Sequence, residues 1–242
     1  MLEELSQVES KLTSANQTIS GSLRITAPSD LGRQHIAPLI NKFKDEHPAV
    51  TPFLNLSDSV TDLTESNIDV AIRYGIDPDS QLIAHKVAQS RRVLCASKSY
   101  LDRYGTPTTP QDLTDHLCLT MVQLRTPMSK WYFSTPDGEI FITINPSRSC
   151  DDGAQIRNWA VEGAGIALKS YWDVAVDLSA NRLVTVLDDF SPDYQSKYLS
   201  IGADLYIAYQ DRKYLPKRIS EFTKTLKEYF QQGFLDDMAT GS

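Results

Sequence analysis

Apolar and polar residues are arranged along this chain in blocks that predict strands and helices in turn. LRITA (23–27) and IDVAIR (68–73) are short apolar runs of the kind that form buried strands. Between them, apolar residues from Leu31 onward have the spacing of one helix face, and His47-Pro48 ends that helix. Further strands are predicted at TPFLNLS (51–57) and RRVLCAS (91–97). Such alternation predicts βαβ units and a largely parallel sheet.

A second set of elements follows in the middle of the chain. Thr109 and Pro110 have the chemistry of a helix start. The turn residues 136–138 lie between two apolar runs and predict a hairpin. A helix is expected over 152–162, closed by Gly163.

The two ends of the chain carry different patterns. Apolar residues near the start repeat with heptad spacing, which predicts an amphipathic helix able to pack on a partner helix. DLYIAYQ (204–210) predicts a strand, and Pro216 begins a helix with one apolar face. The residues from Gly233 onward are polar and small, and we expect them to be frayed.

Composition narrows the class of protein. The chain has 242 residues, 41% of them apolar, and a net charge of −7, so it lacks the basic surface that binding to DNA phosphates requires. Neither a membrane-spanning run nor a signal peptide is evident, which predicts a cytoplasmic protein without a membrane partner. The cysteines are Cys95, Cys118 and Cys150; they lack metal-ligand spacing and are expected to be reduced thiols.

One segment carries a family resemblance. In TDLTESNIDVAIRYG (61–75), Asp62-Leu63 precedes an apolar strand that opens with Asp69 and ends at Arg73-Tyr74-Gly75. This pattern resembles a signature of LysR-type transcriptional regulators, in the half of those proteins that binds effectors. Weaker matches follow in the order of the family, at 21–28, 47–58, 95–116, 159–168 and 181–192.

The resemblance implies a specific architecture. It is an α/β fold of two Rossmann-like subdomains, of the periplasmic-binding-protein type II architecture, preceded by a linker helix. The expected division is a linker-helix tail at 1–20, subdomain I at 21–94 plus 204–232, subdomain II at 95–203, and a frayed tail at 233–242. DNA would be bound only through a winged helix-turn-helix that lies outside this chain.

The resemblance also implies a function, namely binding of a small-molecule effector that controls transcription by the full-length oligomer. A free-standing solute-binding protein of the same two-lobed fold is the alternative. An enzyme is not predicted, because the chain has no nucleophile elbow, zinc-binding helix motif or phosphate-binding loop. We expect no catalytic residue, no metal site and no cofactor.

Candidate effector-binding residues follow from the predicted strand ends, because ligands of open α/β sheets bind beyond the carboxyl ends of strands. These residues are Ser29, Asp30, Ser57, Asp58, Arg73, Tyr74, Ser97, Lys98, Asp151, Asp152 and Gly153. Ordinary helix capping is the alternative for the Ser and Asp residues, and Arg73 and Tyr74 are adjacent, so only one is expected to face the cleft. The effector class stays open: a carboxylate suits helix N-termini and Lys98, whereas the clustered Asp residues favour a hydroxyl or amine.

The first helix carries an unusually wide apolar stripe. In the family, the matching helix packs across a two-fold interface, so a homodimer or tetramer is expected. The predicted interface residues are Leu31, Ile36, Leu39, Ile40 and Phe43. The alternative is that the stripe packs on its own sheet.

Overall fold

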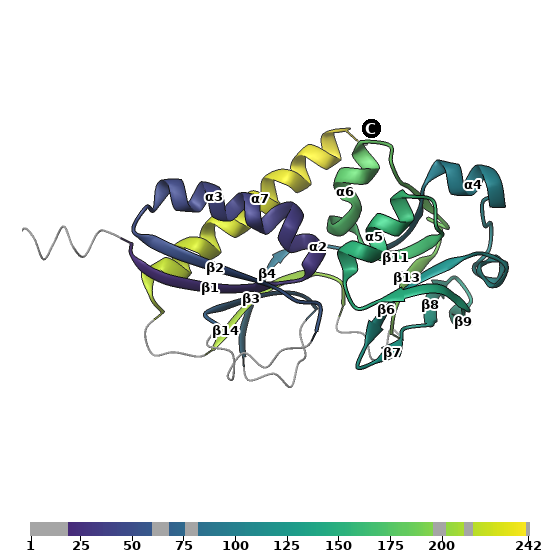
Figure 1. The fold of residues 1–242 in the computed structure, drawn as a ribbon, viewed down its shortest axis with the longest axis horizontal. Helices are drawn as coiled ribbons and strands as arrows, with labels where there is room; N and C mark the ends of the chain where they lie inside the picture. Colours follow the sequence, from purple (N-terminus) through teal and green to yellow (C-terminus); the bar gives the residue numbers. More distant parts are fainter. Residues whose placement is uncertain (1–18, 60–67, 76–81, 196–201, 211–214, 241–242) are drawn as a thin grey trace, which may run out of the picture.

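The computed structural model describes residues 19–59, 68–75, 82–195, 202–210 and 215–240. The predicted N-terminal helix and the helical stretch before the third strand therefore lie outside the described residues. Two sheet-based halves lie side by side along the long axis of the molecule (Figure 1). This is the mixed α/β architecture that the sequence predicted.

The first sheet has five strands, and we call the part built on it subdomain I. Its strands lie in the order β2 (Val50–Leu56), β1 (Gly21–Ala27), β3 (Val70–Tyr74), β14 (Leu205–Gln210) and β4 (Leu82–Ala88). β1 is parallel to β2 and β3, whereas β14 is antiparallel to both of its neighbours. Four of the five strands therefore share one direction, in line with the predicted largely parallel sheet, and only β14, which joins from the far end of the chain, runs against them.

Helices cover one face of this sheet. A continuous helical run consists of α2 (Ser29–Leu31), a π-helical stretch (Gly32–Ile36) and α3 (Ala37–Glu46). α7 (Lys217–Thr240) crosses the same face beside α3 (Figure 1). The backbone of α7 remains helical past the predicted start of a frayed tail, because a single glycine costs a helix only about 1 kcal/mol.

Subdomain II is built on the other sheets. Its main sheet has the order β10 (Pro146–Cys150), β6 (Cys118–Gln123), β11 (Ile166–Ser170), β5 (Arg92–Ala96) and β12 (Val184–Val186), with β7 (Thr126–Pro127) paired to β6. A smaller sheet has the order β13 (Ser191–Asp193), β8 (Lys130–Thr135) and β9 (Gly138–Thr143). The helices are α4 (Lys98–Tyr104), a 3₁₀ turn (Pro110–Asp115), α5 (Gly153–Val161) and α6 (Tyr171–Ser179).

The chain passes between the subdomains at two places. It leaves the first sheet after Ala88 and enters the second at Arg92, a few residues before the boundary that we predicted at 94/95. It returns to the first sheet at Leu205. Among the described residues, no helix is long and apolar enough to cross a membrane.

The apolar stripe of the first helix lies in the core of subdomain I. All five predicted interface residues are buried within this chain, the most exposed being Ile40 at 9%. Phe43 packs edge-on against Phe222 of α7, with ring centroids 5.3 Å apart. The assignment of Leu31, Ile36, Leu39, Ile40 and Phe43 to a subunit interface was therefore wrong: the stripe packs on its own sheet and against α7, which lies beside the helix.

Candidate functional site

The two subdomains meet where two helices begin. α2 of subdomain I lies against α5 and α6 of subdomain II (Figure 1). Ser29, the first residue of α2, is 4% exposed. Its hydroxyl oxygen lies 2.5 Å from Oδ2 of Asp58 and 2.8 Å from Oδ1 of Asp152. We call Ser29, Asp58, Asp152 and Gly153 the Ser29 cluster.

Asp58 connects the subdomains with a single carboxylate. Its Oδ1 accepts a hydrogen bond from the backbone N–H of Ser29 at 3.0 Å, and its Oδ2 accepts one from the N–H of Gly153 at 2.8 Å. These N–H groups belong to the first turns of α2 and α5, where helix N–H groups lack intrahelical partners. A negative charge is stabilised at such a position by the helix dipole.

Asp152 is the local cap of α5. Its Oδ1 accepts from the N–H groups of Ala154 at 2.8 Å and Gln155 at 3.3 Å, and its Oδ2 lies 3.4 Å from Nη2 of Arg33. Burial acts to raise the pKa of Asp152, but the hydrogen bond from Ser29 and the other donors outweigh it, so this pKa lies below its ordinary value. Asp152 is therefore ionised at neutral pH.

A buried ion network, composed of Asp30, Arg157, Lys169, Asp173 and Asp177, lies next to the Ser29 cluster. Asp30, 1% exposed, extends from α2 into subdomain II. There its carboxylate lies 2.7 Å from Nε of Arg157 and 2.9 Å from Nζ of Lys169. Lys169 also contacts Asp173 at 3.2 Å and donates to the carbonyl of Gly153 at 2.9 Å. Arg157 pairs with Asp177 at 2.8 Å.

The charge states of this network follow from burial and pairing. Burial alone would lower the pKa of Lys169, but the carboxylates of Asp173 and Asp30 outweigh it and raise the pKa above its ordinary value. Burial raises the pKa of Asp173, and Lys169 opposes that shift. The positive charge of Lys169 therefore offsets the free-energy cost of burying the carboxylates of Asp30 and Asp173.

Arg73 and Tyr74, at the end of β3, make different contacts. The hydroxyl of Tyr74 donates to Oδ1 of Asp173 at 2.9 Å, which joins the two subdomains again. The guanidinium of Arg73 donates to Oγ1 of Thr26 at 3.0 Å. Burial lowers the pKa of Arg73, and the charge of Asp58 acts in the opposite direction. Tyr74 thus joins the buried ion network, whereas the hydrogen bond of Arg73 to Thr26 lies within subdomain I.

Comparison with known proteins identifies the family. The family model described as the LysR substrate binding domain matches residues 16–231. This chain belongs to that family. It is the effector-binding regulatory domain of a LysR-type regulator, and a free-standing solute-binding protein is not favoured.

Individual relatives of this LysR domain are transcriptional regulators. The HTH-type transcriptional regulator DmlR of Escherichia coli is 28% identical over 234 residues, which cover 97% of this chain and 73% of DmlR. The structure of CrgA, a LysR-type transcriptional regulator from Neisseria meningitidis, matches with a TM-score of 0.77 at 25% identity, over 95% of this chain and 75% of that one. The separate structure of the CrgA regulatory domain matches with a TM-score of 0.73 at 25% identity, over 86% of this chain and 98% of that domain.

Most of the predicted site residues of this LysR domain lie at the subdomain boundary. Ser29, Asp30, Asp58, Asp152 and Gly153 are brought together by the contacts above. Helix capping was the alternative for Ser29, but its side chain makes no capping hydrogen bond to α2, and its N–H donates instead to Asp58 from another loop.

Two other predicted residues lie beside the cluster without joining it. The hydroxyl of Ser57 pairs with Ser59 in the loop that carries Asp58. Asp151 is exposed at the end of β10. Among the described contacts, neither residue reaches the N-terminus of α5, so the cluster is formed by their neighbours in sequence, Asp58 and Asp152.

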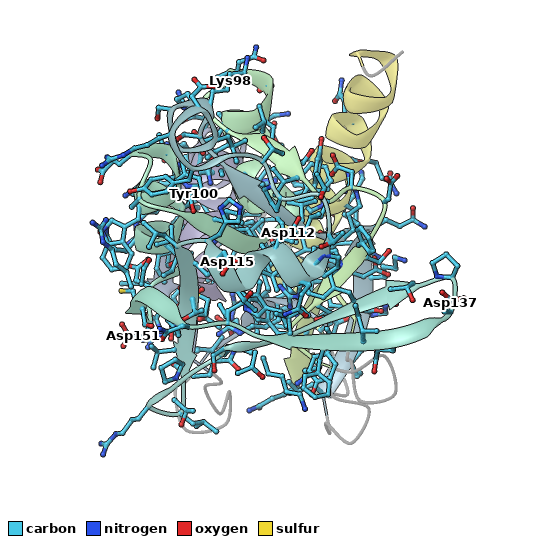
Figure 2. The ribbon with its side chains drawn as sticks, turned by 90° about the vertical axis from the view of Figure 1, so that its right-hand side faces the viewer. Lys98, Tyr100, Asp112, Asp115, Asp137 and Asp151 are labelled. Atoms are coloured by element: carbon cyan, nitrogen blue, oxygen red, sulfur yellow. The ribbon has the colours of Figure 1, made fainter. Side chains whose placement is uncertain are left out.

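Ser97 and Lys98 are not part of this arrangement. β5 runs antiparallel to β11, so its carboxyl end lies at the edge of the sheet opposite to Ser170. Figure 2 shows Lys98 and Asp151 far apart. Ser97 caps α4 by accepting from the N–H of Tyr100 at 3.3 Å. Our expectation that these two residues join the other strand ends was wrong, because it assumed a parallel β5.

Sequence reasoning missed the cationic half of the site. Arg33, Arg157 and Lys169 were not selected, and neither was Asp173. One signal was available: Lys169 lies in the apolar run IALK, and a lysine in a buried strand requires an anionic partner. The identity of that partner was not visible in the sequence, because Asp30 is far away along the chain.

His35 provides a testable pH effect. It is 6% exposed, with Nε2 2.9 Å from the carbonyl oxygen of Trp172 and Nδ1 3.0 Å from the hydroxyl of Tyr229. Burial lowers its pKa, partly offset by the Trp172 hydrogen bond and by Asp30. Below about pH 6.5 the unfolded chain gains a proton at this histidine that the folded chain resists, so folding stability is lost as pH falls.

We therefore expect His35→Gln to show a weaker loss of stability than the wild type between about pH 7.5 and about pH 5.5. Urea unfolding at both pH values measures this difference. His85→Gln is the matched control, because His85 is more exposed and contacts only Tyr209 among the contacts described. Parallel pH profiles for wild type and His35→Gln would contradict the prediction.

Proposed function

We propose that this domain is the sensor of a cytoplasmic transcription regulator and that its small-molecule effector is recognised at the Ser29 cluster. The observation that carries the proposal is the carboxylate of Asp58, which binds the first turns of helices from both subdomains. A ligand at this position contacts both subdomains at once. Its binding therefore changes how they are held together.

The polar groups of the cluster suit reversible recognition. Ser29 offers a hydroxyl, Ser29 and Gly153 offer backbone donors, and Asp58 and Asp152 offer acceptors. Each of these groups has a protein partner in the described structure. An effector that replaces those partners exchanges hydrogen bonds instead of burying unsatisfied groups, so little free energy is lost in the exchange.

The proposal assigns sensing, not catalysis, to this chain. DNA would be bound by a separate winged helix-turn-helix of the same regulator, and the regulator would act as a homodimer or tetramer. The oligomer would use surfaces other than the apolar stripe of the first helix, since that stripe is buried in the core. Changed contacts between the subdomains would then alter how the subunits sit together.

A ligand screen on two serine variants tests the proposal. Small organic acids, amines, amino acids and sugars would be screened by thermal melts of the wild-type chain. We expect at least one compound to raise the melting temperature, following the linkage between ligand binding and stability. We further expect Ser29→Ala to reduce that ligand-induced rise, because the variant removes the hydroxyl that meets Asp58 and Asp152.

Ser97→Ala is the matched control. It removes a capping hydroxyl and lowers stability by about 0.5–2 kcal/mol, but Ser97 lies at the other edge of the sheet. The ligand-induced rise should be intact in this variant. Equal ligand-induced rises in wild type, Ser29→Ala and Ser97→Ala would contradict recognition at the Ser29 cluster.

A further inference from the structure

Asp58 differs from the other carboxylates of the site in where its partners lie. Asp152 caps its own helix, and Asp30 pairs with buried cations. The described partners of the Asp58 carboxylate are Ser29 and Gly153, which come from segments other than its own loop. The side chain is also only partly buried. The Asp58 carboxylate thus contacts both subdomains at their boundary, as the carboxylate of a bound small molecule would.

The position that Asp58 occupies is suited to a carboxylate. Two backbone N–H groups and one hydroxyl surround its oxygens, at distances of 2.5–3.0 Å. The positive charge of Arg73 acts on it as well. Gly153 lies close to this position: a Cβ at this residue would be 3.4 Å from Oδ2 of Asp58 and 3.6 Å from Oγ of Ser29, which are ordinary contacts, and 3.0 Å from Nζ of Lys169.

The Ser29 hydroxyl makes this arrangement easy to displace. It has one proton to donate, yet carboxylate oxygens of both Asp58 and Asp152 lie within hydrogen-bond distance. The two carboxylate groups therefore compete for one donor proton. Asp152 is further held by the backbone of α5 and by Arg33, so Asp58 is the carboxylate that an incoming ligand displaces.

We propose that Asp58 is a tethered competitor of the effector: its carboxylate occupies the position of an effector carboxylate and joins the subdomains when no effector is bound. The inference rests on the proposed function and adds to it a ligand class, small carboxylates, and a means of regulation. Because the competitor is attached to the chain, its effective concentration is high. Only an effector above a threshold concentration replaces it.

The test uses acetate as the probe and the full chain of 242 residues. Backbone amide signals of Ser29 and Gly153 are followed by ¹H–¹⁵N NMR while sodium acetate is added at constant ionic strength. We expect Asp58→Ala to reach half-saturation at an acetate concentration at least about tenfold lower than the wild type, because the competitor is absent. Methylammonium chloride, titrated in the same way, should cause no saturable shift.

A second variant shows whether the effect of Asp58→Ala comes from misfolding. Asp58→Asn keeps the size of the side chain but removes its charge, and it should also bind acetate more tightly than the wild type. Adding Ser29→Ala to Asp58→Ala should reduce the gain, because it removes the hydroxyl that donates to the carboxylate at this position. Acetate responses that are equal in wild type, Asp58→Ala and Asp58→Asn would overturn the inference.

This failure is distinguishable from failure of the proposed function. If the serine screen finds a compound whose effect depends on Ser29, the cluster remains the effector site even though Asp58 is not a competitor. Equal ligand effects in wild type and Ser29→Ala would instead remove the site itself, and the inference with it.

Discussion

Replacing Lys169 by Met is expected to lower the free energy of unfolding by about 3–5 kcal/mol, the usual effect of removing one partner of a buried ion pair. Lys169 is 4% exposed and contacts both Asp30 and Asp173. Methionine matches the length of the side chain but leaves two buried carboxylates with less compensating charge. Urea unfolding of wild type and variant at neutral pH measures the difference.

The loss should also depend on pH. Without Lys169, burial keeps the pKa of Asp173 raised and no ammonium opposes it. The folded variant then binds protons more readily than the unfolded chain, so its stability recovers as pH falls. We expect the difference from wild type to be smaller at about pH 5 than at about pH 8.

Two further variants test whether burial of the ion pairs causes the loss of stability in Lys169→Met. Lys86→Met also removes a lysine of an ion pair, with Asp204, but that lysine side chain is 43% exposed. Exposed pairs contribute about 0–1 kcal/mol, so this variant should be close to wild type. Adding Asp173→Asn to Lys169→Met removes one of the two stranded charges and should restore part of the stability. Similar losses for Lys169→Met and Lys86→Met would show that burial of the network is not important.

Much of the fold was accessible from local sequence patterns. The predicted strand at IDVAIR corresponds to β3, and the hairpin around residues 136–138 corresponds to β8 and β9. Thr109 and Asp112 form the capping interactions expected of a helix start. Gly163 follows α5 with a φ of 82°, a conformation that favours glycine. Each of these features depends on residues within a few positions of one another.

The direction of each strand was not accessible in the same way. An apolar run such as RRVLCAS predicts a strand but carries no information on whether it lies parallel or antiparallel to its neighbours. The antiparallel pairing of β5 with β11 moved Ser97 and Lys98 away from the site. A prediction from strand ends therefore succeeds only where the strands are parallel.

The pairing of charged residues in the site is a second feature that the sequence did not predict. We expected the clustered Asp residues to oppose an anion unless they were paired. Asp30 is indeed paired, but its partner Arg157 is 127 positions away along the chain. Ser29 and Asp152 are separated by 123 positions. Such contacts depend on how the subdomains pack, which no local pattern specifies.

The last prediction concerns Phe43, which the sequence assigned to a subunit interface. Its side chain is fully buried and packs against Phe222 of α7. We expect Phe43→Ala to lower the free energy of unfolding by about 3–5 kcal/mol, because it removes buried apolar surface and leaves a cavity. Urea unfolding at two protein concentrations measures both the loss and its dependence on association.

Phe53→Ala is the matched control on the edge strand β2. Phe53 is 53% exposed, so its truncation should cost much less than that of Phe43. If Phe43 stabilised mainly a subunit contact, the loss would shrink at high protein concentration, since association stabilises by mass action. A loss that is large and independent of concentration assigns Phe43 to the core of a single chain, and the subunit contacts of this LysR domain must then be formed by other residues.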